Sequence, residues 1–164
     1  MRIDVMKTYK LFINGNFPRS ESGRVYEITD AKGKFLANPC SGSRKDLRES
    51  VIAARAAQQG WSNATAYNRG QILYRVAEIM QGRREQFIAE IMAQEGATLA
   101  AARAQVDSAI DTWVWYAGWT DKIDSISGST NPVSGSFYNF TIPESLGVVV
   151  IFADSKPSLL NLAA

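Results

Sequence analysis

One thiol and a set of carboxylates are the side chains of this 164-residue chain that could support covalent or acid–base chemistry. Cys40 is the single cysteine, and the sequence contains no histidine. These counts exclude a Ser-His-Asp triad, a Cys-His pair, an internal disulfide and a cysteine-based metal cluster within the chain. A reactive thiolate needs an electropositive niche, and no histidine or helix N-terminus can be identified beside Cys40. We therefore interpret Cys40 as inert, and we expect no catalytic residue and no metal ligand.

The carboxylates are placed differently from the thiol. Glu90, Glu95 and Asp107 lie on stretches with helical periodicity, where exposed faces carry charge. Paired-carboxylate catalysis requires a geometry that spacing alone does not provide. We interpret these three side chains as parts of solvated helix faces.

The strongest positional signal for a ligand lies near the end of the sequence. Residues 148–153 form an uninterrupted apolar run that predicts a strand buried on both faces, followed by a short polar turn. In an open α/β sheet, ligands bind beyond the carboxyl ends of strands. The candidate ligand-binding residues are therefore Phe152, Ala153, Asp154, Ser155 and Lys156. A connecting loop whose Lys156 faces water is an equally good interpretation, and the chain contains no glycine-rich phosphate loop.

The elements before this run are predicted by turn residues and helical periodicity. Asn14-Gly15 indicates a hairpin turn, with two further short strands at residues 24–29 and 35–37. Ser43 and Asp46 form a capping-box pattern at the start of a helix that we expect to end at Gly60. Three more amphipathic helices are expected, and a half-exposed strand follows at residues 137–142. These helices are expected at residues 66–81, in a stretch that ends at Gly96, and at residues 98–122.

The composition is typical of a globular protein. The sequence is 46% hydrophobic and 21% charged, with a formal net charge of +2. This charge gives no field that would attract nucleic acid or an anionic membrane, and no segment has the length of a secretory signal or membrane span. We expect a cytoplasmic protein with neither nucleic acid nor membrane as a partner.

Several segments resemble the N-terminal part of the aldehyde dehydrogenase superfamily, in the family's order and spacing. They are Leu11-Phe12-Ile13-Asn14-Gly15, Asn38-Pro39-Cys40-Ser41-Gly42, the stretch from Val51 to Trp61-Ser62, Arg69 with Leu73 and Ala77, Tyr116-Ala117-Gly118 with Lys122, and Pro143 to Val149. The stretches 9–11, 17–24 and 113–119 resemble most closely the degenerate second module of two-module members and its free-standing bacterial relatives.

The resemblance implies an α/β fold. Its parts would be a β-hairpin, a layer of four helices, an oligomerisation-type strand at about residues 136–146, and the first strand of a Rossmann-like sheet. Residues 1–164 would then form an incomplete N-terminal part of an NAD(P)-binding domain. A parallel strand needs parallel neighbours, and we expect those neighbours to lie in a longer protein.

The resemblance also implies a chemistry and a departure from it. Family members oxidise aldehydes with NAD or NADP, and an asparagine amide helps to form their oxyanion hole. Lys156 occupies that asparagine position in this chain. The family's nucleophilic cysteine and general-base glutamate belong to segments downstream of Ala164. We therefore expect a fragment that is not catalytically competent alone and binds no cofactor alone, in a homo- or hetero-oligomer with aldehyde dehydrogenase-like subunits. The alternative is a noncatalytic scaffold or oligomerisation partner.

Overall fold

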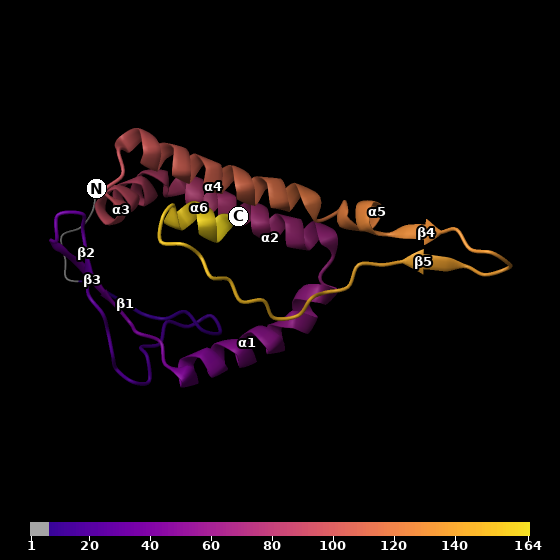
Figure 1. Ribbon diagram of the computed structural model, residues 1–164, viewed down its shortest axis with the longest axis horizontal. Helices are drawn as coiled ribbons and strands as arrows, with labels where there is room; N and C mark the ends of the chain where they lie inside the picture. Colours follow the sequence, from indigo (N-terminus) through magenta and orange to yellow (C-terminus); the bar gives the residue numbers. More distant parts are fainter. Residues whose placement is uncertain (1–6) are drawn as a thin grey trace.

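Helices α2 (Ala66–Gly82), α3 (Arg84–Glu95) and α4 (Leu99–Trp119) form the packed part of the molecule, which a computed structural model describes over residues 7–164 (Figure 1). Their shared core is Ala77, Met80, Ile88, Ile91, Ala102, Val106, Ala109 and Ile110. Val106 is 0% exposed. The short helix α6 (Ser158–Ala163) lies against α4 and adds Leu159, Leu160 and Ala163 to this core. We call these four helices the helical layer.

Local sequence signals define the ends of the long helices. The Thr65 side chain accepts a hydrogen bond from the backbone N–H of Asn68 at the start of α2, and Thr98 accepts one from Ala101 at the start of α4. Gly96 follows α3 in the left-handed conformation, with φ of 70°. The predicted boundaries of these helices are confirmed to within a few residues. The largest difference is at the end of α4, which stops at Trp119 and is followed by a short α5 (Ile123–Ser127).

The position of helix α1 (Arg44–Asn63) differs from the expected layer of four helices. The helix begins with the predicted capping box of Ser43 and Asp46, but it lies away from the other helices (Figure 1). Asp46 is its one buried residue, and Leu47 is 60% exposed. An amphipathic pattern predicts that a helix has an apolar stripe, but it does not specify which surface covers that stripe. The fourth helix of the layer is instead α6.

A small sheet lies beside α1. Strand β3 (Phe35–Pro39) is central, with β1 (Lys7–Tyr9) parallel to it and β2 (Ile28–Thr29) antiparallel to it. The predicted turn at Asn14-Gly15 is confirmed, because both residues have positive φ angles of 51° and 75° and Ile13 bridges to Asn16. The strands are shorter than expected at residues 24–29, where only the last two residues belong to β2.

A second hairpin extends from the end of the helical layer. Strands β4 (Ser129–Asn131) and β5 (Asn139–Thr141) pair antiparallel and project away from the remaining chain (Figure 1). The strand predicted at residues 137–142 is confirmed in its central part, whereas β4 lies in a stretch for which no strand is predicted. The signal for β4 is weak because its side chains are polar: Asn131 donates to Asn139 and Thr141 across the pair, at 2.8 and 3.0 Å.

Residues 148–153 are predicted as the first strand of a parallel sheet, and the structure shows them without a paired neighbour among residues 7–164. They form no strand within the described part of the chain, and most of their side chains are exposed, with Phe152 at 94%. A strand requires a neighbour to accept and donate its backbone hydrogen bonds, and this segment runs from α1 to α6 without pairing to a described strand (Figure 1). The structure is nevertheless mixed α/β, as expected.

Candidate functional site

The turn that follows residues 148–153 docks onto the C-terminal end of α3. Lys156 donates from Nζ to the backbone carbonyl oxygen of Glu95 at 2.8 Å. Ser158 donates twice to Oε1 of the Glu95 carboxylate, from its backbone N–H at 2.9 Å and from its hydroxyl at 2.6 Å. One residue of α3 therefore binds the chain on both sides of Pro157.

Gln105, on the first half of α4, completes this cluster. Its Nε2 donates to Oε2 of Glu95 at 3.1 Å, while its Oε1 accepts from the backbone N–H of Leu159 at 3.0 Å. The Gln105 side chain is buried, so each of its bonds is made away from bulk water. We call Glu95, Gln105, Lys156 and Ser158 the Glu95 clasp.

The electrostatics of the clasp favour an ionised Glu95. Burial is the largest single influence and opposes the charged form, but the two Ser158 hydrogen bonds, the Gln105 amide and the Lys156 charge together outweigh it. The pKa of Glu95 is therefore lowered below its usual value. A carboxylate with both oxygens occupied is held here as an acceptor of hydrogen bonds, and it is not free to act as a base.

The predicted ligand-binding residues behave differently from one another. Lys156 bonds to α3 through its Nζ, whereas Phe152, Ala153, Asp154 and Ser155 make no such bond to the helical layer; all five residues are exposed. The sequence did not predict that Glu95, Gln105 and Ser158 would meet Lys156. Glu95 was interpreted as part of a solvated face, and that interpretation is wrong because its carboxylate is bound by Ser158 and Gln105. The only signal was its position just before Gly96, where a helix ends.

Cys40 directly follows β3, in the small sheet. The residue is 7% exposed, its N–H donates to the carbonyl oxygen of Tyr9 at 2.8 Å, and it bridges to Val25. Such burial shields the sulfur from solvent and from a substrate. Within residues 7–164, no group of three histidine, cysteine, aspartate or glutamate side chains gathers at metal-binding distance.

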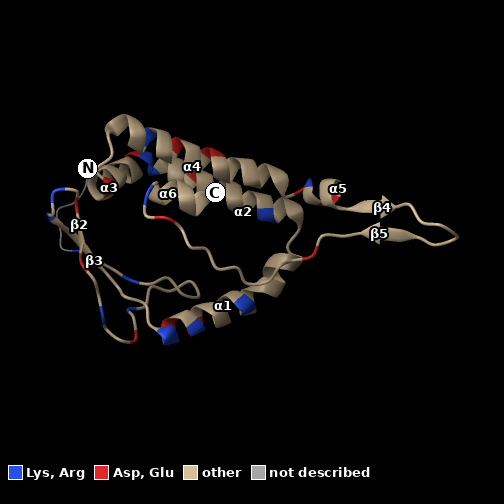
Figure 2. Ribbon diagram, in the orientation of Figure 1, with Lys and Arg blue, Asp and Glu red and all other residues tan. Residues whose placement is uncertain are grey.

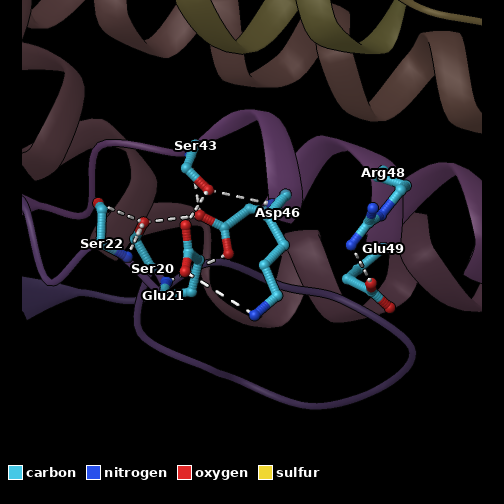
Figure 3. A network of polar contacts seen from close by, with 8 residues as sticks. Ser20, Glu21, Ser22, Ser43, Asp46, Arg48 and Glu49 are labelled. Atoms are coloured by element: carbon cyan, nitrogen blue, oxygen red, sulfur yellow. Dashed lines mark hydrogen bonds and ion pairs between the residues drawn. The ribbon is translucent and has the colours of Figure 1, made fainter.

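A second polar network fixes the start of α1 (Figure 3). The Asp46 carboxylate accepts from the Ser20 hydroxyl at 2.6 Å and from the backbone N–H groups of Ser43 at 2.8 Å and Glu21 at 3.3 Å. The Ser20 bond is the main cause that lowers the pKa of Asp46 to about 2, and the Ser43 backbone bond adds to it. This network attaches α1 to the N-terminal loop and has the character of a structural anchor.

The surface around these sites is of mixed charge, with one uncharged projection. Lysine, arginine, aspartate and glutamate alternate over the helices, whereas residues 129–142, which include β4 and β5, carry none of them (Figure 2). A hollow of about 1270 Å³ lies between α2 and α4, at the end of α4 away from the clasp, and its lining includes Tyr67, Ile72 and Val114. No helix among residues 7–164 combines the length and apolar character needed to cross a bilayer.

Known proteins share both the sequence and the fold. The sequence profile of the aldehyde dehydrogenase family matches residues 17–153. Human mitochondrial 10-formyltetrahydrofolate dehydrogenase is 30% identical over 169 residues, which cover 98% of this chain and 18% of that protein. Human retinal dehydrogenase 2 is 33% identical over 149 residues, covering 87% of this chain and 28% of that protein. The chain thus spans less than a third of the length of these relatives.

Solved structures agree with this assignment. A salicylaldehyde dehydrogenase from Pseudomonas putida G7 superposes with a TM-score of 0.89 at 21% identity, over 97% of this chain and 32% of that one, and this likeness concerns the fold. An aldehyde dehydrogenase from Bacillus cereus superposes with a TM-score of 0.76 at 28% identity, over 82% of this chain and 28% of that one. The match of the family profile to most of the sequence carries the conclusion: the chain belongs to the aldehyde dehydrogenase family.

Proposed function

We propose that these residues serve as the N-terminal part of an NAD(P)-dependent aldehyde dehydrogenase and do not oxidise aldehydes by themselves. The observation that carries the proposal is the position of Lys156. The family resemblance aligns Lys156 with an asparagine whose amide helps to form the oxyanion hole. In this chain, the Lys156 amine is bound to the carbonyl oxygen of Glu95. An oxyanion hole needs a donor aimed at the reacting oxygen, and this donor is already engaged.

The thiol supports the same proposal. Aldehyde oxidation in this family proceeds through a covalent adduct on a cysteine, and such a nucleophile must be reachable by the substrate. Cys40 is buried beside β1 and lies far along the chain from the Lys156 turn. The single thiol of the chain is therefore shielded from an aldehyde.

A dinucleotide does not fit the residues present. NAD and NADP are held in a crevice between strand ends, with the phosphates at a helix N-terminus. Residues 148–153 form no strand, and Phe152, Ala153, Asp154 and Ser155 are exposed. The few contacts that these residues could make would not offset the entropy lost when a dinucleotide is ordered on them. We therefore propose negligible affinity for NAD or NADP in these residues alone.

The direct test is to incubate the purified chain with NAD or NADP and a panel of aliphatic and aromatic aldehydes, and to follow the absorbance of the reduced nucleotide. We expect no reduced nucleotide above the protein-free control. Cys40→Ala is the matched variant, and Lys156→Asn restores the family amide without supplying a nucleophile. Turnover that disappears in Cys40→Ala would contradict the proposal, as would saturable calorimetric binding of NAD that requires Ser155 and Lys156.

A noncatalytic scaffold or oligomerisation subunit is the second candidate function. The observation that favours it is the uncharged hairpin of β4 and β5, where Phe137, Phe140 and Ile142 are exposed and Tyr138 is 75% exposed. Exposed apolar side chains gathered on one projection are typical of protein–protein contact surfaces. We propose a homo- or hetero-oligomer with aldehyde dehydrogenase-like subunits, and sedimentation of the Tyr138→Lys variant beside the unchanged chain tests it. An equal sedimentation coefficient for both would argue against this role.

A further inference from the structure

The short helix α6 begins without a cap from its own sequence. Pro157 stands at its N-cap position and provides no side-chain hydrogen bond. The free N–H groups of a first helical turn need acceptors, and the usual acceptor is the side chain of the N-cap residue. In this chain the acceptor for the Ser158 N–H is Glu95 Oε1, and that for the Leu159 N–H is Gln105 Oε1. Both come from other helices.

Glu95 also contacts the chain on the other side of Pro157, through its backbone carbonyl. The Lys156 ammonium binds the carbonyl oxygen of Glu95, which is among the last carbonyls of α3 and has no partner within that helix. A cation at a helix C-terminus is stabilised by the helix dipole. Lys156 therefore acts as a cap for α3, while the Glu95 side chain acts as a cap for α6.

We propose that Glu95 and Gln105 are positioning residues, which cap α6 from neighbouring helices and thereby fix where Lys156 lies. The inference rests on the proposed function, since it concerns the same turn that carries the family's asparagine position. Its physical basis is that the clasp sets the register of α6 on α4. With the first turn of α6 held beside Glu95 and Gln105, Leu159, Leu160 and Ala163 pack against the core.

The clasp demands two acceptors from the residue at position 95. Oε1 accepts from Ser158 and Oε2 accepts from Gln105, whose own Oε1 is committed to Leu159. A glutamine side chain offers one acceptor and one donor group. Glu95→Gln must therefore lose either the Ser158 bonds or the Gln105 bond, and Glu95→Ala loses all of them. The order of the two variants is a consequence specific to this geometry.

The experiment is residue-resolved amide hydrogen exchange by NMR on the full 164-residue chain. The Ser158 N–H donates to the Glu95 carboxylate, so Glu95→Ala should accelerate exchange at Ser158 by roughly ten- to a hundredfold. Exchange at Leu159, whose acceptor Gln105 loses its bond to Glu95, should accelerate by a smaller factor. The exchange rates in Glu95→Gln should lie between those of the unchanged chain and those of Glu95→Ala. Gln105→Leu should accelerate exchange at the Leu159 amide. Glu78→Gln, which breaks an exposed ion pair with Arg75, is the matched control and should leave both amides unchanged.

A second measurement separates positioning from general stability. The rate at which a small acylating reagent modifies Lys156, compared with that of exposed Lys10 in the same sample, should rise in Glu95→Ala and stay closer to the original in Glu95→Gln. The amides of Val106 and Ala109 should keep their protection in all variants. Unchanged exchange at Ser158 and Leu159 in Glu95→Ala would overturn the proposal, and so would equal loss of protection at Val106. Both readouts are independent of aldehyde oxidation, so activity of the chain would contradict the proposed function and leave this test standing.

Discussion

Two apolar stretches lie only a few residues apart in this chain and have opposite fates. Residues 148–153, the crossing segment, run from α1 to α6 with most of their side chains exposed, whereas residues 159, 160 and 163 of α6 pack against the core of the helical layer. Hydrophobic content does not separate them, since both are rich in valine, isoleucine, leucine or alanine. What separates them is the backbone. A helix forms its own hydrogen bonds, while a strand needs a neighbour.

The comparison shows where the stability of this chain resides. Side chains between α2, α3 and α4 are removed from water and contribute to the free energy of unfolding, and those of the crossing segment do not. Substitutions in the two regions should therefore differ in size even when the residue types match.

The largest difference is expected for a charge placed in each region. Val106→Asp buries an unpaired carboxylate in the layer and should cost more than about 4 kcal/mol, abolishing cooperative unfolding. Val150→Asp, in the crossing segment, should leave the transition in place. Urea denaturation followed by far-ultraviolet circular dichroism measures both. A cooperative transition in Val106→Asp at the original midpoint would break the comparison.

Removing a buried side chain should have the next largest effect. Ile88 belongs to the core, and Ile88→Ala should cost about 2 to 5 kcal/mol because a cavity remains. Ile126, on α5, is 62% exposed, so Ile126→Ala should stay within about 0.5 kcal/mol. The urea midpoints of the two variants give the difference. Equal midpoints would mean that burial in the helical layer does not contribute to the free energy of unfolding.

A smaller effect is expected at the turn that allows α4 to fold back on α3. Gly96 has φ of 70°, and a side chain there would also meet the Ala31 Cβ at 2.8 Å. Gly96→Ala should cost about 1 to 2 kcal/mol for the left-handed backbone alone. Gly82→Ala is the matched control, because nothing lies within 4 Å of a Cβ added there. Thermal unfolding of the pair decides, and a Gly96→Ala variant as stable as Gly82→Ala would contradict the role given to this turn.

Asp46 tests a region held by polar contacts in place of an apolar core. Its pKa is about 2 in the folded chain against the usual 3.8, so its contribution to stability is complete above about pH 4 and is lost as the pH falls towards 2. Asp46→Asn should flatten this acid limb of the stability profile. Ser20→Ala, which removes the main cause of the shift, should flatten it partly. Urea midpoints measured between about pH 5 and pH 2 provide the test, and an acid limb unchanged in both variants would exclude Asp46 as its source.

The smallest effect on stability is expected for Val150→Lys, within about 0.5 kcal/mol, because Val150 is exposed. Its effect should appear in solution behaviour, since an exposed apolar segment with unpaired backbone groups is a template for association. Light scattering should show smaller particles for Val150→Lys. A stable monomer of the unchanged chain at high concentration would refute this.

Local signals predicted the helices well, and long-range contacts were out of their reach. Ser43 with Asp46, Asn14-Gly15 and Gly96 each specify backbone geometry through their own chemistry, and all three appear as expected. The exposed position of α1 and the absence of a strand at residues 148–153 depend on which partners are available, which a one-dimensional pattern does not state. Glu95 was missed for a similar reason, because its partner Ser158 lies 63 residues away.

The distance along the chain between α6 and its contacts has a consequence for folding order and for tolerance of length. Leu159 and its partner Gln105 are separated by 54 residues, and the β4–β5 hairpin lies within that interval. Helices α2 to α4 can assemble through near neighbours, so closure of this long loop should be the late and slow step. Loop entropy grows only logarithmically, by about 0.6 kcal/mol for each doubling. The hairpin tip can therefore lengthen or shorten among homologues while the Lys156 turn stays where the helices hold it.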